Sequence, residues 1–211
     1  MDKDDFKNQV LPEQEKGVPI DTEKSIELPN EDEAIRFYQI ARQRLVDVNR
    51  WQEIAGKLTA EFSLRDATGK PVARTAQKGD HFKIDIPGPG SKGGGGFDWI
   101  QIEDFVEKQE PGFESIAFTV RPATNPEKHT EHTSHFFSPE STSTFTVSRK
   151  NNIVTAGIYD RNTKPNTSGD TIPDKIRNTI IGAFGVGGGA KLQWESLASA
   201  LIEKEEKQTE H

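Results

Sequence analysis

Three histidines recur every three residues in the segment EKHTEHTSHFF, which makes them the clearest candidate metal ligands in the chain. His129, His132 and His135 supply the imidazoles, with glutamates beside them. Three protein ligands and a water form a catalytic zinc site in many enzymes. The spacing differs from the i, i+4 pair of helical zinc enzymes, and residues three apart on a strand point to opposite faces. A metal-dependent enzyme is therefore one hypothesis, and a polar exposed loop is its alternative.

Charged side chains follow three of the predicted strands, where functional groups often lie on a rigid scaffold. Arg121, Arg149 and the neighbours Asp160 and Arg161 occupy these positions. Guanidinium groups suit carboxylates and phosphates, so these residues are candidate ligand-binding side chains and the arginines a candidate anion cluster. Separate surface ion pairs with carboxylates such as Glu103 are the alternative.

Six of the 18 glycines lie between residues 88 and 96, in the segment IPGPGSKGGGGFDW. The segment lacks the spacing and the strand–loop–helix context of a P-loop, which favours a mobile connection over a phosphate site. Asp98 and Trp99 follow it directly. We predict that Asp98, Trp99 and the more distant Trp51 wall a ligand pocket, with burial of the tryptophans in the core as the alternative.

A second glycine-rich segment, GAFGVGGGAKLQW, holds five glycines between residues 182 and 189. Because a predicted helix follows, its free N–H groups could favour an anion. A tight corner between two helices is the alternative. If exposed, the apolar residues among these glycines would instead form an adaptable surface for self-assembly.

The net charge of −7 is concentrated at the start of the 211-residue chain. Residues 1–35 hold 11 acidic and four basic side chains, and they account for the whole excess. We expect an acidic flexible tail over residues 1–29, a single α+β domain over 30–202 and a charged tail over 203–211. The remainder carries no concentrated basic stripe, so a nucleic-acid partner is not expected.

Several function classes lack support in the composition. The chain has no cysteine, which excludes disulfides, thiol catalysis and thiolate metal sites. No apolar run approaches the ~18 residues of a membrane span. The first residues do not resemble a secretory signal, so a cytoplasmic location is expected. No cofactor-binding motif is found, and no cofactor is expected.

Hydrophobic periodicity predicts helices at both ends of the domain and strands between them. Asn30 and Glu33 have the spacing of a capping box before a helix over residues 31–48. About seven segments then alternate apolar and polar residues, typical of antiparallel strands. Apolar stripes at 172–180 and 192–201 predict a C-terminal helix pair. The predicted fold class is α+β, with an N-terminal helix, a curved sheet or half-barrel and the helix pair.

This order of elements is similar to that of START-like helix-grip domains, in which a curved sheet holds a long C-terminal helix. The resemblance rests on element order and on no sequence motif. The strand-rich middle, its aromatic residues and the two glycine-rich segments as possible gates suggest a ligand held between the sheet and the last helix. A closed or half-closed barrel flanked by helices fits the same pattern.

Three functions are compatible with these patterns. The first is a non-enzymatic domain that binds an apolar or amphipathic small molecule. The second is a structural protein that forms a homo-oligomer through its C-terminal glycine-rich segment. The third is the metal-dependent enzyme built on the histidines. Because no strong catalytic motif is present, we favour the non-enzymatic alternatives.

Overall fold

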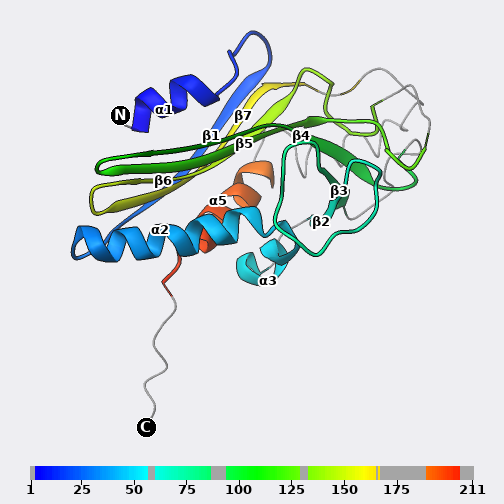
Figure 1. The fold of residues 1–211 in the computed structure, drawn as a ribbon. Helices are drawn as coiled ribbons and strands as arrows, with labels where there is room; N and C mark the ends of the chain where they lie inside the picture. Colours follow the sequence, from blue (N-terminus) through cyan, green and yellow to red (C-terminus); the bar gives the residue numbers. More distant parts are fainter. Residues whose placement is uncertain are drawn as a thin grey trace.

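The computed structural model describes residues 3–56, 60–86, 94–128, 133–164, 166 and 189–204. A short helix and a strand come first, two helices follow, and six strands precede the last helix (Figure 1). The elements are α1 (Lys3–Val10), β1 (Val18–Glu27), α2 (Glu31–Val46), the 3₁₀ turn η1 (Val48–Arg50), α3 (Trp51–Ala55), β2 (Glu61–Arg65), β3 (His81–Asp85), β4 (Asp98–Glu110), β5 (Phe113–Pro122), β6 (Thr142–Lys150), β7 (Ile153–Thr163) and α5 (Gly189–Leu201).

The strands form one seven-stranded sheet in the order β1-β7-β6-β5-β4-β3-β2, and every neighbouring pair is antiparallel. Strands β2 to β7 are neighbours in chain order, whereas β1 pairs with the last strand, β7. The predicted α+β class, with an N-terminal helix, a curved antiparallel sheet and a C-terminal helix, is confirmed. The element order is that of a helix-grip fold.

The turns follow from residues that tolerate a positive φ. Gly112 connects β4 to β5 at φ 72°, and Asn151 connects β6 to β7 at φ 52°. Asparagine adopts this left-handed region more readily than most residues. Asn151 and Asn152 therefore form the turn between β6 and β7.

Asn30 caps the start of α2, as its spacing to Glu33 predicts. Asn30 Oδ1 accepts the Glu33 N–H at 2.9 Å, which satisfies one backbone group that a helix start leaves unpaired. Asn30 Nδ2 donates to Glu33 Oε1 at 3.0 Å, so the second bond joins the two side chains rather than closing the capping box through the backbone. The apolar stripe of α2, which includes Ala34, Ala41 and Leu45, is buried against the sheet.

The main core lies between the concave face of the sheet and helices α2, α3 and α5. Trp51 at the start of α3 is fully buried, and its ring packs against Phe62, Phe82, Phe118 and Phe145. Leu197 and Leu201 bury the inner side of α5. Together these side chains hold the C-terminal helix across the sheet.

Residues 3–27 include a helix and a strand of the fold, whereas their charge predicted an acidic flexible tail over residues 1–29. Val18–Glu27 is the edge strand β1, paired with β7 along its length. Helix α1 lies on the opposite, convex side of the sheet from α2 and α5 (Figure 1). There Phe6 packs edge-on against Phe113, with ring centroids 6.0 Å apart. Acidic side chains of this segment pair with basic side chains of the fold, which explains how so charged a segment becomes ordered.

One further predicted strand is absent from the described residues, and two further predicted segments lie outside them. The sequence predicts a strand at residues 72–74, but the described residues show only an isolated bridge nearby, between Arg65 and Pro71. The first helix of the predicted C-terminal pair and residues 205–211 of the predicted tail lie outside the described residues.

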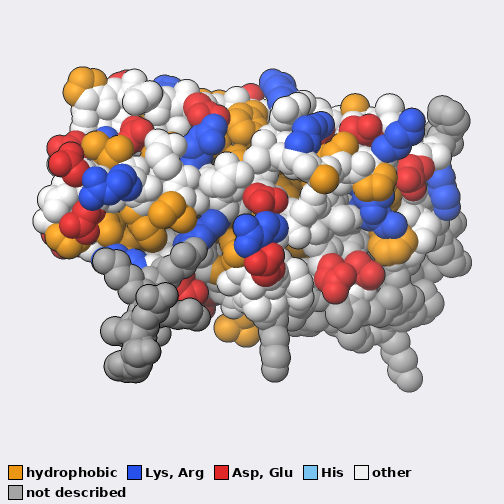
Figure 2. All heavy atoms as spheres, turned by 60° about the horizontal axis from the view of Figure 1, so that its bottom comes forward, with side chains coloured by type: hydrophobic (Ala, Val, Ile, Leu, Met, Phe, Trp, Pro, Cys, Tyr) orange, Lys and Arg blue, Asp and Glu red, His pale blue; other side chains and the backbone are white. Residues whose placement is uncertain are grey.

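The face that carries α2 and α3 mixes acidic, basic and apolar side chains where the structure describes it (Figure 2). No extended patch of one sign is visible on this face among the described residues. Among the described helices, none is both long and apolar enough to cross a bilayer.

Candidate functional site

A cavity, partly open to solvent, lies between α5 and one end of the concave face. Its wall is mainly apolar, with Phe62, Ile84, Ile100, Val120, Phe145 and Trp194 as its main side chains. Alternate residues of a strand point to the same face, so successive strands each add to this wall. The volume of the cavity is about 60 Å³, several times the ~10–15 Å³ that a single water needs.

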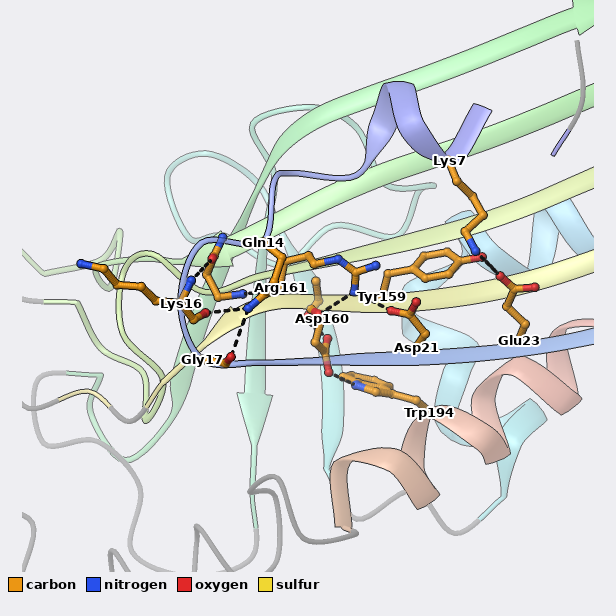
Figure 3. A network of polar contacts seen from close by, with 12 residues as sticks. Lys7, Gln14, Lys16, Gly17, Asp21, Glu23, Tyr159, Asp160, Arg161 and Trp194 are labelled. Atoms are coloured by element: carbon orange, nitrogen blue, oxygen red, sulfur yellow. Dashed lines mark hydrogen bonds and ion pairs between the residues drawn. The ribbon is translucent and has the colours of Figure 1, made fainter. Parts of the chain in front are cut away.

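Asp160 is the charged residue of the cavity wall. It lies in β7 opposite Ser143 of β6, and Ser143 Oγ donates to Asp160 Oδ1 at 2.6 Å. Trp194 Nε1 of α5 donates to Asp160 Oδ2 at 2.9 Å (Figure 3). The residue is only 4% exposed. Burial raises the pKa of Asp160 to about 6, although both hydrogen bonds favour the ionised form.

Trp194 joins the carboxyl group to the aromatic part of the wall. Its ring lies 6.2 Å from that of Phe62 and 5.4 Å from that of Phe145, at 89° to the latter. Indole N–H groups need a partner when they are buried, and Asp160 provides one. The bond also fastens α5 to β7 at the cavity.

His135 lies in the wall near the start of β6. Its Nδ1 accepts the Phe137 N–H at 3.0 Å, so the neutral ring carries its proton on Nε2. Burial lowers the pKa of His135 to about 3, because a charged imidazole loses its hydration there. The wall therefore combines one carboxylate with an uncharged imidazole at neutral pH.

The three residues predicted to wall a pocket beside the first glycine-rich segment do not line the cavity. Trp51 lies behind it in the core, in contact with Phe62 and Phe145. Trp99 is buried and donates through Nε1 to the Gly94 carbonyl at 3.2 Å. Asp98 is buried at the start of β4, where burial raises its pKa to about 7. Ligand binding by these residues stays a prediction, and Trp51 has the packing of a core side chain.

The three arginines lie in separate environments. Arg121 pairs with Glu103 at 2.7 Å at the surface. Arg149 is buried beneath the start of α2, where Nε donates to Glu114 at 2.7 Å.

Arg161 points to the convex side of β7, opposite Asp160, and pairs with Asp21 at 2.5 Å (Figure 3). The predicted anion cluster is thus replaced by separate ion pairs. Of the seven predicted ligand-binding residues, Asp160 is the one that lines the cavity.

The histidine cluster is only partly described. His129 and His132 lie outside the described residues, and His135 is part of the cavity wall. Within the described part of the chain, no three His, Asp or Glu side chains are grouped to hold a metal ion. The glycines of the second segment up to residue 188 also lie outside it, so self-assembly through that segment stays a prediction.

Sequence reasoning missed Ser143 and Trp194 as site residues. The apolar stripe at 192–201 places Trp194 in the last helix, which is correct. The available signal was its polar N–H in an otherwise aliphatic stripe, which calls for a buried acceptor. Ser143 gave no signal, because its role depends on the register between β6 and β7.

No family model matches the sequence, and no curated protein matches it. Among solved structures, the hypothetical protein jhp0584 of Helicobacter pylori is similar over 88% of this chain and 86% of its own, with 9% identity and a TM-score of 0.51. Major latex-like protein 151 of Panax ginseng matches over 88% and 97%, with 11% identity and a TM-score of 0.40. Truncated norcoclaurine synthase of Thalictrum flavum matches over 92% and 100%, with 6% identity and a TM-score of 0.37. At these identities, the likeness to the H. pylori protein shows a shared fold and nothing finer, and the two weaker likenesses carry no argument.

Proposed function

We propose that this protein binds a small, largely apolar molecule in the cavity between the sheet and α5. The observation that carries the proposal is an apolar, aromatic cavity with one buried carboxylate in its wall. Ligand sites typically combine mostly apolar walls with a few convergent polar groups. Here Asp160, Ser143 and His135 supply those groups on one side of the cavity.

The energetics of packing support this proposal. Protein interiors are packed as densely as organic crystals, whereas the apolar wall of this cavity of about 60 Å³ is partly open to solvent, and removing apolar surface from water contributes about 25 cal/mol per Å². A ligand that fills the cavity would gain part of this free energy through contact with Phe62 and Phe145. The volume favours a ring or short chain of a few atoms, with any longer part extending through the opening.

We further propose that the ligand is held without being transformed. Both oxygens of Asp160 already accept hydrogen bonds, and Nδ1 of His135 accepts one from the backbone. Part of the hydrogen-bonding capacity of both residues is therefore used to hold the wall together, and the remaining lone pairs of Asp160 can bind a polar group of the ligand.

Calorimetric titration with benzyl alcohol, a small ring with one polar group, tests binding. We expect saturable one-to-one binding to the full chain, with the alcohol recovered unchanged. Ala60→Leu places extra methylenes in the cavity wall and is expected to weaken binding at least about fivefold, roughly 1 kcal/mol. Ala73→Leu, at an exposed position, is the matched control. Equal binding by all three proteins, or none by the wild type, would reject the proposal.

A further inference from the structure

We propose that the cavity selects a ligand with a cationic nitrogen, that is, a small amphipathic amine whose ammonium group pairs with Asp160. This inference rests on the proposed function and adds the chemical class of the ligand. Its basis is a buried carboxylate in an aromatic wall that forms no ion pair with a described lysine or arginine.

The first observation is the charge balance around Asp160. Its two hydrogen-bond donors, Ser143 and Trp194, are both neutral. Among the described residues, no lysine or arginine forms an ion pair with this carboxylate. The nearby Arg161 faces the convex side, where it pairs with Asp21, and donates to the backbone carbonyl of Asp160 at 2.9 Å.

A buried charge without a counter-ion is costly, and proteins usually pair such charges or neutralise them. A carboxylate can accept about four hydrogen bonds, whereas Asp160 accepts two from the side chains of Ser143 and Trp194. Two lone-pair positions are therefore left for a further donor on a residue that lines the cavity. An ammonium group supplies both the missing charge and the donors.

The second observation is the aromatic surroundings of the same carboxylate. The rings of Phe62, Phe145 and Trp194 line the cavity next to Asp160. The negative face of an aromatic ring attracts a cation within about 6 Å, most strongly where water is excluded. A ring or short chain attached to the nitrogen would fill the apolar remainder of the cavity.

The third observation concerns the other polar group of the wall. A cationic His135 would repel an ammonium ligand and compensate Asp160 itself. Burial and the bond from Phe137 N–H keep this imidazole neutral instead. The cavity wall thus carries one negative charge and no positive one among its described residues.

The test compares three probes of almost equal shape, namely benzylamine, benzyl alcohol and benzoate. Their affinities are measured by calorimetry near pH 7.5 with the full chain. We expect benzylamine to bind at least about tenfold more tightly than benzyl alcohol, and benzoate to bind more weakly than both because Asp160 repels it. Asp160→Asn keeps the shape of the side chain and removes its charge. This variant is expected to abolish the preference for the amine and leave the affinity for benzyl alcohol within about twofold.

Asp104→Asn is the control for net charge, because Asp104 is exposed and pairs with Lys78 at 3.3 Å, outside the cavity lining. It should keep the full preference for benzylamine. If benzyl alcohol binds but benzylamine binds no more tightly to the wild type, the amine inference fails and the proposed function stands. If no probe binds, the proposed function itself fails. Because the wild-type comparison needs no variant, the inference stays testable even if Asp160→Asn does not fold.

Discussion

Asp160 costs the fold free energy at neutral pH. Burial raises its pKa from 3.8 to about 6, so the folded protein holds this proton more tightly than the unfolded chain. Between these two pKa values the folded state binds more protons, and the free energy of unfolding falls as pH rises. The shift corresponds to about 3 kcal/mol at most.

We therefore expect Asp160→Asn to stabilise the protein more at about pH 7.5 than at about pH 4. The free energy of unfolding of the variant minus that of the wild type should be about 2 kcal/mol larger at the higher pH. Urea unfolding of both proteins at both pH values measures this difference. Other titrating groups, such as Asp98 and His135, are present in both proteins and cancel. A difference that does not change with pH would contradict the assignment. Asp104→Asn, a substitution at an exposed residue, should show almost no such dependence on pH.

The pKa of Glu23 is shifted in the opposite direction to that of Asp160. Burial alone would raise its pKa, but hydrogen bonds from Lys3, Lys7 and Tyr159 lower it to about 2. This stabilisation is complete above the ordinary pKa of 4.5 and is lost as pH falls toward 2. We expect Glu23→Gln to lower the free energy of unfolding at neutral pH by about 1–2 kcal/mol, a value reduced for solvent screening. Chemical denaturation measures this loss. Glu53→Gln, which removes a surface ion pair, should lower the free energy of unfolding by less.

At the level of single residues, part of the site could be predicted from the sequence. Asp160 was recognisable because it follows a predicted strand, and the structure places it in the cavity wall. Its partner Trp194 lies 34 positions away on another element, and only the docking of α5 brings the two together. Side-chain spacing could not predict that contact.

At the scale of elements, α1 is fastened to the convex face mainly by one ring. Phe6 is 1% exposed and packs with Phe113 and Ala117. Phe6→Ala is expected to lower the free energy of unfolding by about 2–4 kcal/mol, measured by urea denaturation. Asn8→Ala, on the exposed side of the same helix, should change it by less than about 0.5 kcal/mol. Equal effects of the two changes would show that α1 is not docked in this way.

The segment between α1 and β1 is held by Asn162. Its Oδ1 accepts the N–H groups of Glu15 and Lys16 at 2.8 and 3.1 Å, and its Nδ2 donates to the Glu13 carbonyl at 2.9 Å. Asn162 also has a φ of 56°, a conformation that favours asparagine or glycine.

Two substitutions at Asn162 separate these contributions. Asn162→Gly keeps the backbone conformation and removes the amide, whereas Asn162→Ala loses both, so alanine should be the more destabilising by about 1 kcal/mol. Thermal unfolding of the two variants measures the difference. A glycine variant as unstable as the alanine variant would mean that the hydrogen bonds alone matter.

β5, β6 and β7 were predictable because apolar residues recur at every second position, as Ile116, Phe118 and Val120 do in β5. β1 escaped prediction for a physical reason. It is an edge strand with solvent on much of both faces, and Thr22 is its buried residue. Its pairing with β7 comes from backbone hydrogen bonds and from ion pairs such as Asp21 with Arg161, which leave no apolar period in the sequence.

At the scale of the whole molecule, the acidic start of the chain is part of the fold. Its carboxylates neutralise bases of the convex face and of α1, as Glu23 does for Lys3 and Lys7. The concave face holds the apolar core, and the cavity interrupts that core at the end where α5 meets β7. The helix-grip order was visible in the sequence, whereas the cavity depends on side-chain packing that periodicity does not report.

Entry of a small molecule into this cavity can be tested directly on the indole N–H resonances of the three tryptophans. Trp194 N–H points to Asp160 in the wall, whereas those of Trp51 and Trp99 donate to backbone carbonyls outside it. During titration with benzyl alcohol, nitrogen-edited NMR of the labelled protein should show a saturable shift of the Trp194 resonance alone. Assignment by Trp194→Phe identifies that peak. Absence of any shift, or equal shifts of all three resonances, would contradict binding in the cavity.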